Sequence, residues 1–80
     1  FNPSTTIEYS LHRTGTVELK VYDLKGSVVR QLVSQEKSAG THQVIWDGRD
    51  DQGALVPSGL YFCRADAGYQ ASSLKLVLLK

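Results

Sequence analysis

The chain has 80 residues, a length that fits one small domain. Hydrophobic residues make up 41% of it and charged residues 21%, which is ordinary globular composition and excludes a disordered or collagen-like chain. The formal net charge of +1, with basic residues scattered singly, argues against nucleic-acid binding, and no apolar run approaches the ~20 residues of a membrane span.

The amino-terminal part of the chain alternates apolar and polar residues with the period of two that is typical of β-strands. This pattern predicts strands from Thr5 to Leu11 and from Thr16 to Asp23. The apolar side chains of each strand fall on one face, so we expect Tyr9, Leu19 and Val21 to lie in the core.

The next segment contains a predicted hairpin turn followed by a strand of unclear phase. The turn runs from Asp23 to Ser27, and the strand runs from Val28 to Val33. Both faces of that strand carry apolar side chains, which a β-bulge or an edge position would explain. The polar, glycine-punctuated segment from Ser34 to Thr41 is predicted to be a loop.

The second half of the chain predicts three more strands. They run from His42 to Asp47, with Trp46 facing inward, from Leu60 to Ala67, and from Gln70 to Leu79. No stretch of about ten residues has a helical period, and each half-apolar sheet must bury its face on another. The sequence therefore predicts an all-β protein, a small antiparallel β-sandwich of about six to seven strands.

Candidate catalytic groups are few and scattered. Cys63 is the single cysteine, so no internal disulfide can form, and it shares a strand face with Tyr61. We expect both side chains in the core. His12 and His42 are far apart in sequence and neither lies beside a candidate nucleophile. The sequence therefore predicts no enzymatic activity, no cofactor and no zinc site.

One acidic cluster, Asp47, Asp50 and Asp51, has two interpretations. Carboxylates in a loop can bind calcium, although the spacing does not match the EF-hand loop. Alternatively, Asp side chains accept hydrogen bonds from nearby backbone N–H groups and so close turns. We favour turn chemistry and keep calcium as the alternative.

Three aromatic residues, Tyr22, Phe62 and Tyr69, are predicted to lie outside the core. Together they would offer a stacking platform for a sugar, but nothing in the sequence places them side by side. A carbohydrate-binding module is therefore a minor alternative.

Several segments form an ordered set that extends over nearly the whole chain. They are Phe1 to Ile7, Val21 to Gly26, Gly40 to His42, Trp46 to Gly53, Val56 to Arg64 and Lys75 to Lys80. The set resembles the type A C-terminal sorting domain of the type IX (Por) secretion system. From Trp46 to Tyr61 it is equally similar to the Ig-like domain of the flagellar hook-capping protein family.

The first resemblance implies an Ig-like sandwich, cut from a larger secreted protein, that acts as a sorting signal over residues 1–80. It implies an N-terminal cargo domain in the same chain, with an outer-membrane translocon and a sortase as partners. It also implies a secreted or cell-surface location, reached through the periplasm of a Gram-negative bacterium. The residues that match its recognition motifs are Gly59, Tyr61, Lys75 and Lys80.

The second resemblance leaves a different function open. The domain would then be a structural Ig-like module, either a scaffold of the hook-cap type or an accessory module of an extracellular enzyme.

Overall fold

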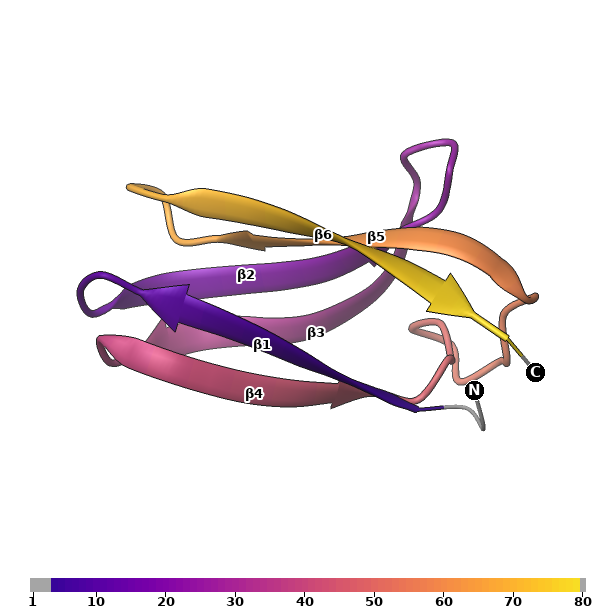
Figure 1. The fold of residues 1–80 in the computed structure, drawn as a ribbon, viewed down its shortest axis with the longest axis horizontal. Helices are drawn as coiled ribbons and strands as arrows, with labels where there is room; N and C mark the ends of the chain where they lie inside the picture. The colour runs from indigo at the N-terminus through magenta and orange to yellow at the C-terminus, as the bar shows by residue number, and fades with distance from the viewer. Residues whose placement is uncertain (1–3, 80) are drawn as a thin grey trace.

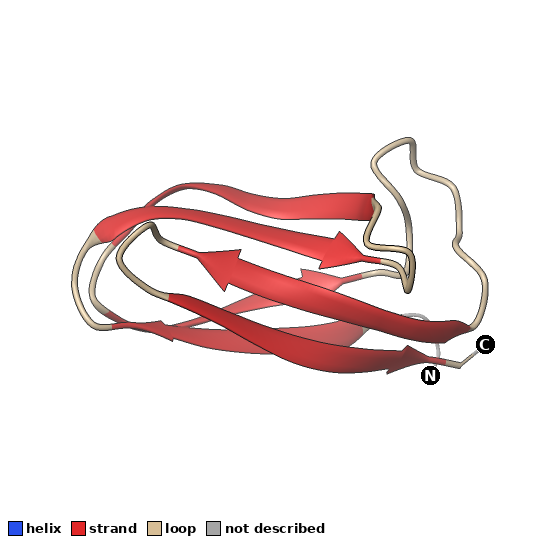
Figure 2. Ribbon diagram, turned by 90° about the horizontal axis from the view of Figure 1, so that it is seen from above, coloured by secondary structure: helices blue, strands red, loops and turns tan. Residues whose placement is uncertain are grey.

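Two antiparallel β-sheets pack face to face in the computed structural model, which describes residues 4–79 (Figure 1). The strands are β1 (Thr5–Leu11), β2 (Gly15–Tyr22), β3 (Val28–Lys37), β4 (Gly40–Trp46), β5 (Gly59–Asp66) and β6 (Ala71–Leu78). β1 pairs with β4 in a two-stranded sheet, and the other four form a sheet in the order β3-β2-β5-β6. The predicted all-β antiparallel sandwich is confirmed, with strands and loops only among the residues described (Figure 2).

Residues 4–79 contain no helix long and apolar enough to cross a membrane.

The core lies between the two sheets, where the alternation of each strand directs its apolar side chains. All six of the residues expected there are buried, namely Tyr9, Leu19, Val21, Trp46, Tyr61 and Cys63. Trp46 is 0% exposed, and its ring meets that of Tyr61 edge to face, with 5.4 Å between centroids. An aromatic pair of this geometry adds to the burial energy and joins β4 of one sheet to β5 of the other.

β3 owes its unclear sequence pattern to two irregularities and to its position. Its register with β2 shifts twice, which leaves Val29 and Leu32 opposite no partner residue. Both side chains are partly buried against the core, although they are three positions apart and strict alternation would place them on opposite faces. β3 is also an edge strand, so a bulge and an edge position act together here.

The prediction of a loop from Ser34 to Thr41 is wrong. β3 continues to Lys37 and β4 begins at Gly40, which leaves a two-residue connection. The backbone of this segment still pairs with β2, while its polar side chains face water at the edge of the sheet, so no apolar alternation marks the strand. Gly40 has a φ of 122°, a conformation that glycine adopts readily and that lets the chain reverse within so few residues.

The burial of Trp46 gives a direct stability prediction. Trp46→Ala should lower the free energy of unfolding by about 3–5 kcal/mol, because it removes a large buried ring and leaves a cavity. Small domains are stable by about 5–15 kcal/mol in total, so the variant should melt much earlier than the parent chain.

The neighbouring residue supplies the control for this measurement. Ile45 is 63% exposed on the same strand, so Ile45→Ala should change the melting temperature little. Equal melting temperatures for the two variants in circular dichroism would contradict the central position of Trp46.

Candidate functional site

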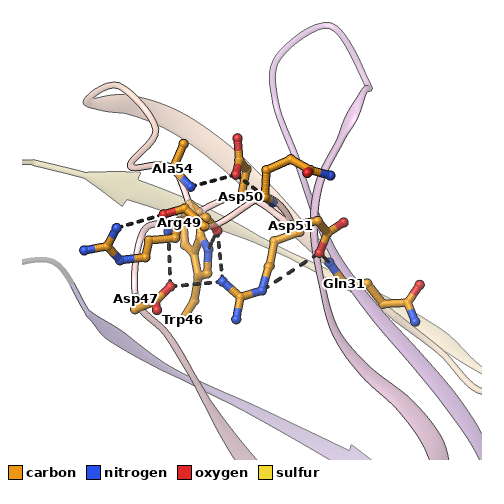
Figure 3. Close-up of polar contacts among 10 residues, drawn as sticks. Gln31, Trp46, Asp47, Arg49, Asp50, Asp51 and Ala54 are labelled. Atoms are coloured by element: carbon orange, nitrogen blue, oxygen red, sulfur yellow. Dashed lines mark hydrogen bonds and ion pairs between the residues drawn. The ribbon is translucent and has the colours of Figure 1, made fainter.

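The segment between β4 and β5, residues 47–58, contains a dense network of polar contacts (Figure 3). It is anchored at its start by Trp46, whose indole N–H donates to the carbonyl of Arg49 over 3.0 Å. Further along, the N–H of Val56 donates to the carbonyl of Gly48 over 3.0 Å, and the Val56 side chain is buried. The loop is therefore held at both ends and is continuous with the core.

Asp50 closes the turn at the tip of this loop. Its carboxylate Oδ1 accepts hydrogen bonds from the N–H groups of Gln52 and Ala54, at 2.9 and 3.0 Å. Its own N–H donates to the carbonyl of Ala54, and its carbonyl accepts from Gly53. A short acidic side chain that satisfies nearby backbone donors is the turn chemistry considered for this segment.

Asp51 attaches the loop to the edge of β3. The N–H of Asp51 donates to the carbonyl of Val29 over 3.1 Å, and its carboxylate accepts from the N–H of Gln31 over 3.0 Å (Figure 3). These two backbone groups lie where the bulges disturb the strand. One residue of the loop thus satisfies groups that an edge strand would otherwise leave open to another chain.

Arg30 bridges the edge strand and the loop. Its guanidinium donates to the Asp47 carboxylate over 3.1 Å and to the carbonyl of Arg49 over 3.2 Å, and it lies 4.0 Å from the Asp51 carboxylate. Sequence reasoning did not single out Arg30. The one available signal was a cation between apolar residues of a strand whose partner loop is acidic.

The three aspartates do not converge on a common centre. Each carboxylate faces a different set of donors: Arg30 and Arg49 for Asp47, the turn backbone for Asp50, and β3 for Asp51. Within residues 4–79, no group of three or more His, Cys, Asp or Glu side chains could hold a metal ion. This arrangement offers no calcium cage.

Gly59 and Tyr61 have a structural explanation at the start of β5. The Tyr61 hydroxyl donates to the carbonyl of Pro57, four residues upstream, over 2.7 Å. This contact matches the tyrosine corner of immunoglobulin-like sandwiches. Gly59, between them, has a φ of 154°, which favours glycine. Burial, and secondarily the nearby Asp23 carboxylate, raises the pKa of Tyr61.

The other two predicted recognition residues lie elsewhere. Lys75 is exposed on β6, where it pairs with Phe62 on the outer face of the sheet, whereas Tyr61 points into the core. Lys80 lies outside the residues that the structure describes. The structure does not bring Lys75 together with Gly59 and Tyr61.

Only two of the three candidate platform aromatics are neighbours. Tyr22 and Phe62 are directly paired across β2 and β5. Tyr69 belongs to the β5–β6 connection, where its hydroxyl contacts the backbone of Arg13 and its ring lies 4.2 Å from the Arg13 guanidinium carbon. Tyr69 therefore fastens two turns together and does not complete a platform.

The candidate catalytic side chains occupy separate places. His42 stacks on Tyr9, and its Nε2 lies 2.8 Å from the carbonyl of Ser38, whereas His12 is exposed in the β1–β2 turn. Cys63 is buried, and this burial raises the pKa of its thiol. Among the contacts of residues 4–79, none joins Cys63 to a histidine.

The contribution of the tyrosine corner to stability can be measured by removing one hydroxyl group. Tyr61→Phe should lower the free energy of unfolding by about 0.5–1.5 kcal/mol, since it deletes the hydrogen bond to Pro57 and keeps the ring. Tyr22→Phe, on the outer face, is the matched control and should lower the free energy of unfolding much less. Urea unfolding curves compare the two, and equal losses would argue against the corner.

The buried thiol makes stability depend on pH. Above the ordinary thiol pKa of 9.0, the unfolded chain loses its Cys63 proton while the folded chain keeps it. The folded state then binds more protons, so the free energy of unfolding should fall as the pH rises from about 8 to about 10. Cys63→Ala should show a shallower fall, and an identical slope in the two proteins would contradict the burial effect.

Comparison with known proteins finds FlgD proteins among the relatives of this chain. The basal-body rod modification protein FlgD of Salmonella typhimurium is 42% identical over 45 residues, which are 56% of this chain and 19% of that protein. FlgD of Salmonella typhi matches with the same figures. The crystal structure of FlgD from P. aeruginosa superposes with a TM-score of 0.70 at 27% identity, over 94% of this chain and 59% of that chain. The chain thus spans only part of each relative.

The family model described as the FlgD Ig-like domain matches residues 3–71, which is most of the chain. The predicted type IX sorting signal is therefore wrong, as are the translocon and sortase predicted as its partners. The residues that carried that resemblance, among them Trp46, Gly59 and Tyr61, are explained by the sandwich itself and do not distinguish the two families. This chain belongs to the FlgD Ig-like domain family.

Proposed function

We propose that this chain is a non-catalytic structural module of a FlgD-type protein, with a scaffolding role in building the flagellar hook and rod. The family match over residues 3–71 carries this proposal. The FlgD relatives from Salmonella, described as basal-body rod modification proteins, support the same assignment. Because the chain spans 19% of those proteins, the proposal concerns one module and not the whole activity.

The chemistry of the polar loop supports a structural role. The carboxylates of Asp47, Asp50 and Asp51 and the guanidinium of Arg30 bind backbone groups or one another. Their hydrogen bonds are thus formed within the fold, where they hold the loop on the edge of β3. A module of this kind acts through its shape and surface. Its predicted secreted or cell-surface location, and its place in a larger chain, stay predictions.

A domain exchange tests the proposal. In a Salmonella typhimurium strain that lacks FlgD, a chimera would carry residues 3–71 of this chain in place of the matching segment of FlgD. We expect the chimera to restore swimming in soft agar to a measurable fraction of the level given by the intact protein.

Three controls make the outcome decisive. A chimera with Trp46→Ala should lose swimming because the module unfolds, and one with Ile45→Ala should keep it. An unrelated β-sandwich domain of similar length should not restore swimming. A chimera that is folded and stable in immunoblots but gives no swimming would overturn the proposal.

A further inference from the structure

The outer face of the four-stranded sheet is apolar at one end. Tyr22 pairs with Val28 on one side and with Phe62 on the other, and Leu60 pairs with Val77 in the next row. Val28, Leu60, Phe62 and Val77 are between 38% and 53% exposed. We call this set, Tyr22, Val28, Leu60, Phe62 and Val77, the apolar patch.

Such a cluster is unusual on the water-facing side of an antiparallel sheet, where polar residues are expected. The outer face of the other sheet follows that expectation, with Ile45 as its exposed large apolar residue. The residues paired across it are Thr6 with Ile45, Glu8 with Gln43, and Ser10 with Thr41. The apolar patch is therefore a local property of the larger sheet, and contiguous exposed apolar surface of this kind marks interaction sites.

Charged residues are arranged in rows beside the apolar patch. Lys75 borders it directly, because it is the cross-strand partner of Phe62. The next row along the strands contains Lys20 opposite Arg64, and the row beyond it contains Glu18 opposite Asp66. Along the strands, cations therefore lie between the apolar patch and the carboxylates of Glu18 and Asp66. Other carboxylates lie closer, since Asp50 and Asp51 line a hollow with Val28 and Asp23 lines a groove with Leu60.

The two acidic residues of that face are engaged with its cations. Glu18 lies 3.7 Å from the Lys20 ammonium, and Asp66 lies 3.6 Å from the Arg64 guanidinium. Among the ion pairs of residues 4–79, none includes Lys75. On the β6 side, the border of the apolar patch therefore carries a positive charge, that of Lys75, outside these ion pairs. On the β3 side, the carboxylates of Asp50 and Asp51 near Val28 already accept hydrogen bonds from backbone N–H groups.

A turn extends this surface at the end of the sheet. The segment between β2 and β3 projects from the sheet in Figure 1, and it contains Leu24, which is 67% exposed. Leu24 and Lys25 line a shallow groove of about 240 Å³ with Leu60. The Asp23 carboxylate in this groove already accepts hydrogen bonds from the N–H groups of Lys25 and Ser27. The groove repeats the combination of apolar side chains and a bordering lysine.

We propose that the apolar patch docks a protein partner whose contact surface has an apolar centre bordered by aspartate or glutamate side chains. The apolar centre would bury Phe62 and its neighbours, and the carboxylates would face Lys75, Lys25 and the Lys20–Arg64 row. Charge complementarity of this kind orients a partner and rejects surfaces of the same sign. The side chains of the patch are at most about half exposed and lie on a regular sheet, so we assign them to a protein surface, with a lipid surface as an outcome of the test.

This proposal goes beyond the scaffolding role and has a test that needs no flagellum. The probe is a synthetic 12-residue peptide of alternating leucine and glutamate, titrated into the ¹⁵N-labelled chain and followed by NMR. We expect amide shift changes confined to the apolar patch and to the cations beside it, Lys20, Lys25, Arg64 and Lys75, and binding that weakens several-fold between low and high salt. The same peptide with lysine in place of glutamate should bind at least about tenfold more weakly.

Matched variants locate the binding surface. Phe62→Ser with Val77→Thr should weaken binding more than about tenfold, because each apolar side chain loses its buried contact. Lys75→Glu should weaken it roughly threefold, as expected for an exposed charge pair. Ile45→Ser, on the other sheet, should leave it unchanged. Circular dichroism confirms that each variant is folded, which is expected because these side chains are exposed.

Three results would overturn the proposal. The first is no binding of the acidic peptide, or equal binding of the acidic and basic peptides. The second is shift changes that fall outside the apolar patch and the four cations beside it. The third is binding of the chain to vesicles of anionic phosphatidylglycerol without binding to the peptide, which would assign the patch to a lipid surface. The swimming assay of the chimera is independent of all three, so the two proposals fail separately.

Discussion

The contact between Trp46 and Tyr61 is the interaction on which the rest of the molecule depends. A two-stranded sheet is too small to cover its partner unless a large side chain fills the space between them, and the fully buried Trp46 does so. Its ring packs against Tyr61 of the other sheet, and its N–H fixes Arg49 at the start of the polar loop. Tyr61 in turn holds Pro57 at the end of that loop. One aromatic pair thus joins both sheets and both ends of the longest connection.

The sequence predicts strands well where one face of the strand is buried and the other is exposed to solvent. β1 has the predicted bounds, Thr5–Leu11, because each alternate residue must enter the core. β3 was predicted too short, since its bulges mix the two faces and its last residues are polar on both sides. A period-based argument detects burial on one face and has no signal for a strand held by backbone pairing alone.

The loop and the function show a second limit. The contacts of Arg30 and Asp51 join segments that are distant in sequence, so their spacing along the chain carries no sign of them. The motif from Trp46 to Tyr61 was informative about the sandwich, because its tryptophan, glycine and tyrosine have packing and turn roles. Residues that any such sandwich needs cannot separate two families that share it. The match over residues 3–71 was needed to choose between them.

The order of strand pairing also determines how the chain must fold. Neither β1 with β4 nor β2 with β5 joins neighbouring strands, so the central pairings bring together distant parts of the chain. Loop-closure entropy opposes such contacts until several form at once, and sandwiches of this kind fold in milliseconds to seconds, well above the microsecond times of helical bundles. Among residues 4–79, β4 is the strand that pairs with β1, so β1 has no partner there until β4 has been synthesised. β1 therefore stays unpaired until the part of the chain that contains Trp46 has been synthesised.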